Sequence, residues 1–129
     1  MGSVKDLEII QKPSKKRFGI GRFHFSDRYS VFDWGKMPDE IPQKGEALCI
    51  IGAYFFEKLK ELKIPSHYIG VVEDGETKDL KSLRKPTSVM EVKLVRVIKP
   101  EKLREGGYSY FNFKEEENYL VPLEIIFRN

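Results

Sequence analysis

One segment of the chain restricts the fold more than any other, because residues 46–63 have the period of a long amphipathic helix. Apolar residues recur at spacings of three and four, which places them on one helix face: Leu48, Ile51, Phe55, Leu59 and Leu62. Pro65 cannot continue a helix and marks its end. The sequence therefore predicts one helix whose apolar face packs against the rest of the protein.

The segments on both sides of this helix are predicted to be strands, because apolar residues alternate in them or β-branched and aromatic residues prevail. Lys12-Pro13-Ser14 and Asp74-Gly75 are predicted turns, and residues 35–45 an ordered loop, since they contain prolines. The predicted strands are residues 4–10, 17–25, 67–72, 89–98, 108–113 and 119–128. This order predicts an α+β fold with a mostly antiparallel sheet packed on one long helix.

Composition limits the function classes. The chain has 129 residues, enough for one domain, and 23 Lys+Arg against 20 Asp+Glu give a formal charge of only +3. This balance does not predict a nucleic-acid partner. A single cysteine, Cys49, excludes an intrachain disulfide, and no run approaches the roughly 18 apolar residues of a membrane span. We therefore expect a cytoplasmic protein with no membrane partner.

Several catalytic motifs are absent from the sequence. The Gly19-Ile20-Gly21 segment lacks the Gly-Lys-Ser/Thr ending of a Walker A loop. One cysteine and two histidines, His24 and His67, offer no zinc spacing, and there is no nucleophile elbow. Both histidines are interpreted as packing or surface residues, and Cys49 as an inert core residue. Hydrolase and zinc-enzyme functions are accordingly disfavoured.

A first candidate site is the basic segment Lys15-Lys16-Arg17, which leads into Gly19 and Gly21. The glycines indicate a tight turn or a bulged strand. Positive charge beside such a turn is able to bind phosphates, because backbone donors approach where no side chain blocks them. The alternative is a solvated basic edge that discourages aggregation of the sheet.

A second candidate site surrounds the start of the helix. Asp27 and Arg28 are adjacent charges in an aromatic stretch, Asp33 follows them, and Lys44 precedes the helix. Backbone N–H groups at a helix start are able to face an anion. The alternative is that Asp27 pairs with Arg28, Asp33 caps a turn and the helix simply begins here.

A third candidate site lies in the last predicted strand. Glu124 and Arg128 are four residues apart and would share a face of that strand. Two charges in an apolar strand are costly unless they are paired or bind a ligand. They are read either as a structural ion pair or, with Arg128 as a two-pronged clamp, as a site for a substrate carboxylate.

Taken together, five segments resemble the SAICAR synthetase family in the same order along the chain. They are residues 26–33, 41–48, 53–59, 64–68 and 121–129, which read SDRYSVFD, IPQKGEAL, AYFFEKL, IPSHY and VPLEIIFRN. The resemblance runs from about residue 15 to the end. Residues 99–118 are similar to an insertion between two strands that the family joins closely.

The resemblance implies that residues 1–129 are an N-terminal, nucleotide-binding lobe with a kinase-like or ATP-grasp-like fold, without the family's C-terminal lobe. It implies an ATP-dependent C–N ligase of purine biosynthesis (phosphoribosylaminoimidazole-succinocarboxamide synthase) that forms SAICAR from carboxyaminoimidazole ribotide and L-aspartate, with ATP and Mg²⁺. We expect the isolated chain to be inactive. The alternative is a truncated, non-catalytic paralogue that binds a nucleotide or a protein. A homo-oligomer is left open.

The resemblance also implies roles for individual residues. Lys15 or Lys16 would lie over the nucleotide phosphates, and Lys93 beside the nucleotide. Residues 119–123, including Leu123, would contact adenine through their backbone, and Glu124 would reach into the cleft. The residues expected at the imidazole-ribotide and aspartate end are Asp33, Lys44 and the carboxylate clamp Arg128. No metal ligand is assigned within the chain.

Overall fold

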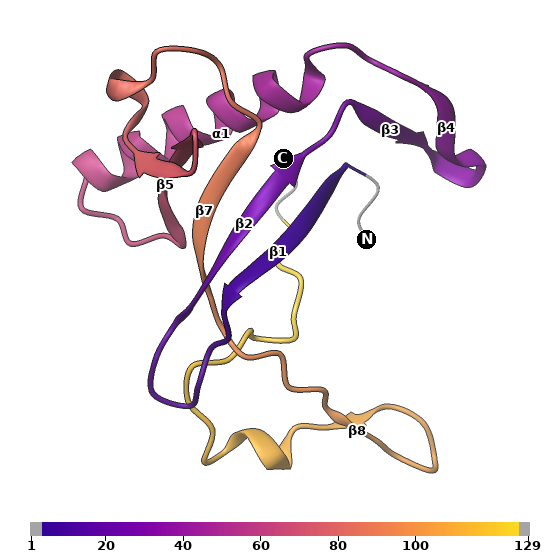
Figure 1. Ribbon diagram of the computed structural model, residues 1–129. Coiled ribbons are helices and arrows are strands. Elements are labelled where there is room, and N and C mark those ends of the chain that lie inside the picture. The colour runs from indigo at the N-terminus through magenta and orange to yellow at the C-terminus, as the bar shows by residue number, and fades with distance from the viewer. Residues whose placement is uncertain (1–3, 127–129) are drawn as a thin grey trace.

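The computed structural model describes residues 4–126, without the side chain of Asp33, and confirms the predicted α+β class (Figure 1). Five antiparallel strands form one sheet in the order β1-β2-β7-β5-β6, and one long helix, α1 (Lys44–Glu61), packs on it. The strands are β1 (Lys5–Gln11), β2 (Gly19–Phe25), β5 (Tyr68–Glu73), β6 (Glu76–Lys78) and β7 (Val89–Leu94).

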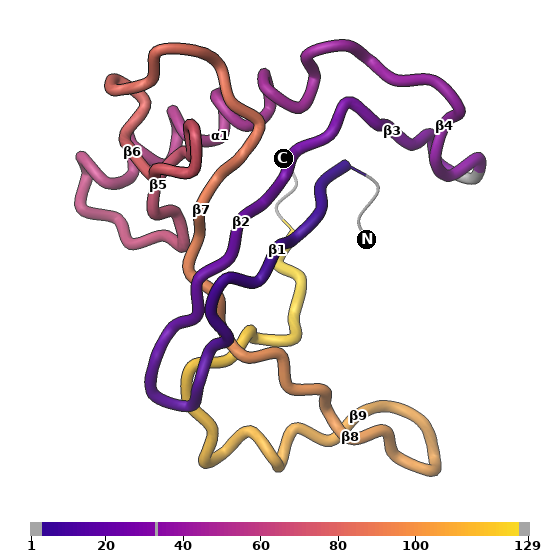
Figure 2. Tube along the Cα trace, viewed as in Figure 1, coloured from indigo at the N-terminus to yellow at the C-terminus, as the bar shows by residue number. Residues whose placement is uncertain are grey.

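Two small hairpins extend from opposite ends of this layer (Figure 2). The first joins β3 (Arg28–Val31) and β4 (Gly35–Glu40) through the 3-10 turn η1 (Phe32–Trp34). The second joins β8 (Glu101–Lys102) and β9 (Tyr108–Ser109), followed by η3 (Phe111–Phe113). A further 3-10 turn, η2 (Leu80–Ser82), follows β6. No helix among residues 4–126 is long and apolar enough to cross a membrane.

Several predicted boundaries are wrong, and pairing explains each one. Residues 35–40 form β4 instead of a loop, because Pro38 is tolerated in a two-stranded ribbon. The strand predicted over 89–98 ends at Leu94, since its partner β2 begins opposite it at Gly19. The strand over 108–113 shortens to two residues, and none forms over 119–126, where only Tyr119 bridges to Arg96.

The turn between β5 and β6 lies where the sequence predicts it. Asp74 and Gly75 have φ angles of 51° and 85° and connect the paired residues Glu73 and Glu76, as a two-residue hairpin turn requires. This confirms the predicted turn. The helix begins two residues earlier than predicted and ends at Glu61, because Lys63 takes a left-handed conformation with φ 59° before Pro65 is reached.

The helix packs on the sheet through its small residues, which corrects the predicted core face. Gly45, Cys49 and Ala53 are buried, whereas Leu48 is 40% and Phe55 61% exposed. The sheet side of the core already holds large residues: Tyr68, Val71, Met90 and Val92. A Cβ atom on Gly45 would lie 2.5 Å from the Phe25 carbonyl oxygen, so the helix axis lies too close for a bulky face. Burial raises the pKa of the Cys49 thiol to about 11, consistent with an inert core residue.

The histidines occupy the structural positions expected of them. His24 Nε2 lies 2.8 Å from a carboxylate oxygen of Glu8 on the neighbouring strand. The His67 ring packs edge-to-face on Phe56, with ring centroids 4.9 Å apart. Burial and the charge of Lys5 lower the pKa of His67, which favours the neutral ring.

We expect the packing face to determine how substitutions in α1 affect stability. Ala53→Leu should lower the free energy of unfolding by ~1–3 kcal/mol, because no space is available between helix and sheet. Phe55→Gln should change it by less than about 1 kcal/mol, since the ring is mostly in solvent. Urea unfolding of both variants measures the difference. The reverse order would show that the apolar stripe is the core face after all.

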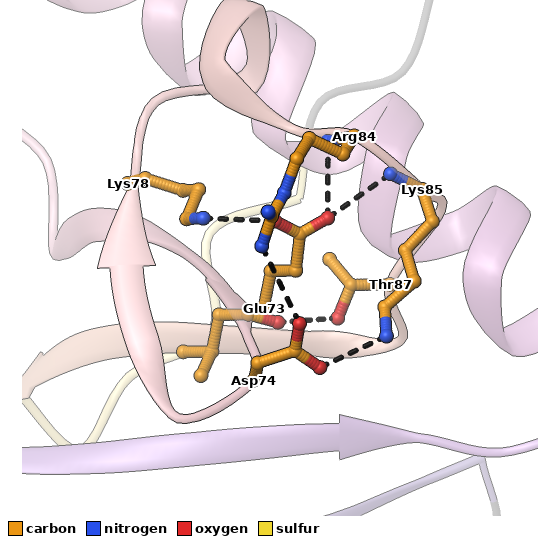
Figure 3. A network of polar contacts seen from close by, with 7 residues as sticks. Glu73, Asp74, Lys78, Arg84, Lys85 and Thr87 are labelled. Atoms are coloured by element: carbon orange, nitrogen blue, oxygen red, sulfur yellow. Dashed lines mark hydrogen bonds and ion pairs between the residues drawn. The ribbon is translucent and has the colours of Figure 1, made fainter.

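A buried carboxylate fixes the end of β5 to the loop that follows β6 (Figure 3). The Glu73 side chain is fully buried and accepts hydrogen bonds from Lys78 Nζ at 2.8 Å and Arg84 Nε at 3.2 Å. The backbone N–H groups of Arg84 and Lys85 each donate to it at 3.0 Å. Nearby, the Thr87 hydroxyl donates to the Val72 carbonyl at 2.6 Å. The loop therefore has a fixed path although its surface is polar.

The Glu73 network should make stability depend on acid. The hydrogen bond from Lys78, together with those from Arg84 and Lys85, lowers the pKa of Glu73 from 4.5 to about 2. A carboxyl group with a depressed pKa stabilises the fold above its unfolded pKa, and this contribution is lost as pH falls. The melting temperature of the wild type should therefore fall as pH is lowered from about 4.5 to 2. Glu73→Gln should lower the melting temperature at neutral pH and flatten this pH dependence.

The exposed neighbour Glu76 provides the control, because Glu76→Gln removes a carboxylate from the same hairpin without entering the network. It should retain the acid dependence of the wild type. An unchanged pH profile for Glu73→Gln would contradict the account.

Candidate functional site

The basic segment predicted from the sequence forms the loop between β1 and β2. This loop, residues 12–18, is termed the lysine loop. The Ser14 N–H donates to the Arg17 carbonyl at 2.9 Å, and the Arg17 N–H donates to Ser14 Oγ at 3.1 Å. These bonds close a compact turn with Lys15 and Lys16 exposed between them.

The two glycines after the lysine loop have structural reasons to be glycine. A Cβ atom on Gly19 would lie 2.4 Å from the Gln11 carbonyl oxygen and 2.6 Å from the Pro13 nitrogen. Gly21 pairs with Ile9, and the register shifts between Ile9 and Gln11, so the bulge lies on β1 opposite the glycines. The prediction of a tight turn or a bulged strand is therefore met next to the glycines and not at them: the turn precedes Gly19, and the bulge lies on the partner strand β1.

The opposite wall of the site is formed where the chain returns after β7. Residues 97–117, termed the excursion, leave the sheet and carry β8 and β9; residues 118–121, the crossing segment, then pass beside the end of β7 (Figure 1). The Arg96 N–H donates to the Asn118 carbonyl at 2.9 Å, and the Leu120 N–H donates to the Arg96 carbonyl at 2.8 Å. The Arg96 guanidinium also pairs with Glu116.

A hollow of about 580 Å³ lies between the lysine loop and the crossing segment, and is termed the lysine hollow. Its volume is in the range of ~300–1,000 Å³ typical of small-ligand sites. It combines charged groups with an apolar surface, and its lining residues are Lys15, Lys16, Phe18, Val95, Glu117, Asn118, Tyr119 and Val121. It offers cations for phosphates and an apolar surface for a planar group.

The electrostatics of the lysine hollow are positive at the loop. Within residues 4–126, neither Lys15 nor Lys16 forms an ion pair. Hydrogen bonding from Arg96 lowers the pKa of Glu116, and the charge of Lys15 lowers it further. Lys93 extends this charge, since its Nζ lies 5.7 Å from the centroid of the Phe18 ring.

A second hollow, of about 500 Å³, lies at the start of α1. The backbone N–H groups there, which could bind an anionic ligand, already bind a carboxylate of the chain. The Asp27 carboxylate accepts hydrogen bonds from the N–H groups of Gln43 at 3.1 Å and Gly45 at 2.8 Å. Arg28 pairs with Asp6 at 2.6 Å, so the expected local pairing of Asp27 with Arg28 is wrong. Asp27 acts as a cap supplied from outside the helix.

The remaining predicted residues do not join the lysine hollow. Lys44 is the first residue of α1, at the opposite end of β2; six residue steps of ~3.4 Å put the two ends about 20 Å apart. Its Nζ is buried, with no hydrogen-bond partner among residues 4–126. Asp33 lies in η1, but its side chain is not described. Arg128 lies outside the described residues, and the strand on which it was predicted to share a face with the exposed Glu124 does not form over residues 119–126.

Leu123 lies just beyond the lysine hollow. It lines a smaller apolar hollow of about 210 Å³ that shares Tyr119 and Val121 with the larger one. The structure therefore brings Lys15, Lys16 and Lys93 to the same end of the sheet as residues 119–123. Sequence reasoning missed Phe18, Val95 and Asn118; the last could have been suspected, because Asn after the charge run of residues 114–117 is a residue that tolerates positive φ.

A model of the SAICAR synthetase family matches residues 15–129 of this chain. The chain belongs to the SAICAR synthetase family. It is similar to a protein of Archaeoglobus fulgidus with a provisional assignment as phosphoribosylaminoimidazole-succinocarboxamide synthase, at 55% identity over 129 residues. It also resembles phosphoribosylaminoimidazole-succinocarboxamide synthases of Thermoplasma volcanium, at 32% identity over 106 residues, and Mannheimia succiniciproducens, at 39% over 115 residues.

The chain spans only part of these SAICAR synthetase relatives. The matches cover 100%, 82% and 88% of this chain but 38%, 28% and 37% of the Archaeoglobus, Thermoplasma and Mannheimia proteins. No solved structure matches the chain significantly. The family is therefore established from sequence, and the candidate site is described from the geometry alone.

The close approach at Gly19 gives a direct test of the lysine loop. Gly19→Ala should lower stability and alter the loop, because its Cβ would meet backbone atoms at 2.4 and 2.6 Å. Gly52→Ala is the matched control, since its Cβ would lie at an ordinary 3.5 Å from Met90 Cε. Because alanine is more stable than glycine inside a helix, Gly52→Ala should instead raise the free energy of unfolding by ~0.5–1 kcal/mol. Chemical unfolding compares the two; equal stabilities would contradict the described loop geometry.

Proposed function

We propose that this chain binds ATP in the lysine hollow as part of an ATP-dependent C–N ligase of purine biosynthesis. The reaction would form SAICAR from carboxyaminoimidazole ribotide and L-aspartate, in the cytoplasm. Membership of the SAICAR synthetase family supports the reaction class. The single observation that supports the nucleotide site is the lysine hollow itself, where Lys15 and Lys16, which form no ion pair within residues 4–126, lie beside an apolar surface.

Different residues in and beside the hollow contact different parts of the nucleotide. Lys15 and Lys16 bind the phosphates, and Lys93 adds positive charge from β7. Tyr119 and Val121, from the crossing segment, contact the base from one side, and Phe18 contacts it from the other. Leu123 and Glu124 continue this wall. Positioned positive charge stabilises the charge that develops during phosphoryl transfer, so electrostatics and positioning are the chain's contribution to catalysis.

ATP, when bound, supplies the phosphoryl group that activates the substrate carboxylate for attack by the aspartate amine. Magnesium has no evident holder in the described part of the chain, because no three His, Cys, Asp or Glu side chains converge among residues 4–126. No step is therefore assigned to magnesium.

Lys44, Asp33 and Arg128 form the second part of the proposal, as the residues that meet the imidazole ribotide and aspartate. The supporting observation is Lys44 Nζ, which is buried without a hydrogen-bond partner among the described residues. A buried ammonium group is costly unless it is paired, so an anionic substrate there would remove that cost. Lys44 and the lysine hollow lie toward opposite ends of β2, so the bound substrates would extend along this strand to meet.

The nucleotide site is tested by ATP binding measured with isothermal titration calorimetry. Lys15→Ala and Lys16→Ala should each weaken binding about fivefold, the effect expected from ~1 kcal/mol per exposed charged contact. Lys12→Ala is the control, because Lys12 belongs to the same loop and carries the same charge but does not line the hollow. It should leave the affinity unchanged.

Two results would contradict the proposal. An equal loss in all three variants would indicate general attraction by the basic loop and not a built site. ATP binding without ligation, in the longest polypeptide that the gene encodes, would favour the alternative of a non-catalytic nucleotide-binding module.

A further inference from the structure

Asn118 makes the only side-chain link between the crossing segment and the lysine loop among the hydrogen bonds of residues 4–126. Its Nδ2 donates to the carbonyl oxygens of Ser14 and Arg17, both at 2.7 Å. These two acceptors bracket Lys15 and Lys16, so one side-chain amide spans the turn that carries both lysines. The donor and its acceptors are 104 and 101 residues apart in sequence.

Asn118 makes these contacts at a local cost. Its φ angle is 52°, in the left-handed region, which asparagine tolerates better than most non-glycine residues but glycine adopts more readily. Its Oδ1 is buried and has no hydrogen-bond partner among the described residues, which costs free energy. Rotating the amide would not relieve this, because Oδ1 would then face two carbonyl oxygens. Glycine would remove both costs, but it would also lose the two hydrogen bonds to the lysine loop.

The other side of Asn118 is fixed to the sheet. Its carbonyl accepts the Arg96 N–H at 2.9 Å, and Arg96 also binds Glu116 and the Glu117 carbonyl. The lysine loop itself is mostly exposed, and the hydrogen bonds that it makes within itself among the described residues are the two between Ser14 and Arg17. The position of the loop over the hollow therefore depends on a chain of contacts from β7 through Asn118.

We propose that Asn118 is a positioning residue that holds Lys15 and Lys16 in the geometry that receives the nucleotide phosphates. This inference rests on the proposed function and assigns the preorganisation of its phosphate site. Holding charged donors in place before binding reduces the ordering cost that the ligand must offset. Asn118 acts through the lysines and not by contact with the phosphates.

The test compares ATP with adenosine, which has the same base and sugar but no phosphate, by calorimetry on the full chain. Asn118→Gly retains the left-handed backbone and removes both hydrogen bonds. Asn118→Ser has one hydroxyl hydrogen and keeps at most one of them; it also carries the test if the glycine variant does not fold. Asn112→Gly is the control, because Asn112 Nδ2 makes a 3.4 Å bond to the Lys99 carbonyl within the excursion and has no contact with the loop.

The expected result is selective for the phosphates. Asn118→Gly should weaken ATP binding about tenfold, less than the loss of both lysines, and leave adenosine binding within about twofold of the wild type. Asn118→Ser should give an intermediate loss, and Asn112→Gly none.

An equal weakening of ATP and adenosine, or no weakening of either, would overturn the positioning role while leaving the ATP site intact. Absence of any nucleotide binding by the unmodified chain would overturn the proposed function, and this inference with it.

Discussion

The return of the chain to Arg96 after a long excursion is the constraint on which the candidate site depends. Two backbone hydrogen bonds and the ion pair with Glu116 hold the crossing segment at the end of β7. Because that segment lies there, Asn118 reaches the lysine loop, and Tyr119 lines the same hollow as Phe18. The candidate site is thus assembled from three distant parts of the sequence.

The sheet and helix provide the rigid support for this arrangement. The close packing of Gly45, Cys49 and Ala53 on the sheet fixes α1, and Asp27 caps its first turn from outside. This packing leaves the larger apolar residues of α1, such as Ile51 and Phe55, in solvent. The start of α1, with the buried Lys44, thus lies at one end of β2, and the lysine hollow lies at the other end.

Features encoded locally could be predicted from the sequence, and features that depend on distant backbone positions could not. The helix, the α+β class and the Asp74-Gly75 turn follow from residue periodicity and backbone preference, and so does the basic loop beside Gly19. The buried face of α1 could not be predicted in this way. It is determined by the Phe25 carbonyl, which approaches too closely for any side chain at Gly45. Asn118 was missed for a similar reason, since its partners are more than 100 residues away.

The most direct test of the central claim is the titration of the ¹⁵N-labelled chain with ATP, followed residue by residue through its amide NMR signals. The account predicts saturable shifts confined to the lysine loop, the end of β7 and residues 118–121, with the start of α1 unchanged. Saturable shifts centred on α1 or on the β3–β4 hairpin, with the lysine loop unaffected, would contradict it and move the nucleotide site to the opposite end of the sheet.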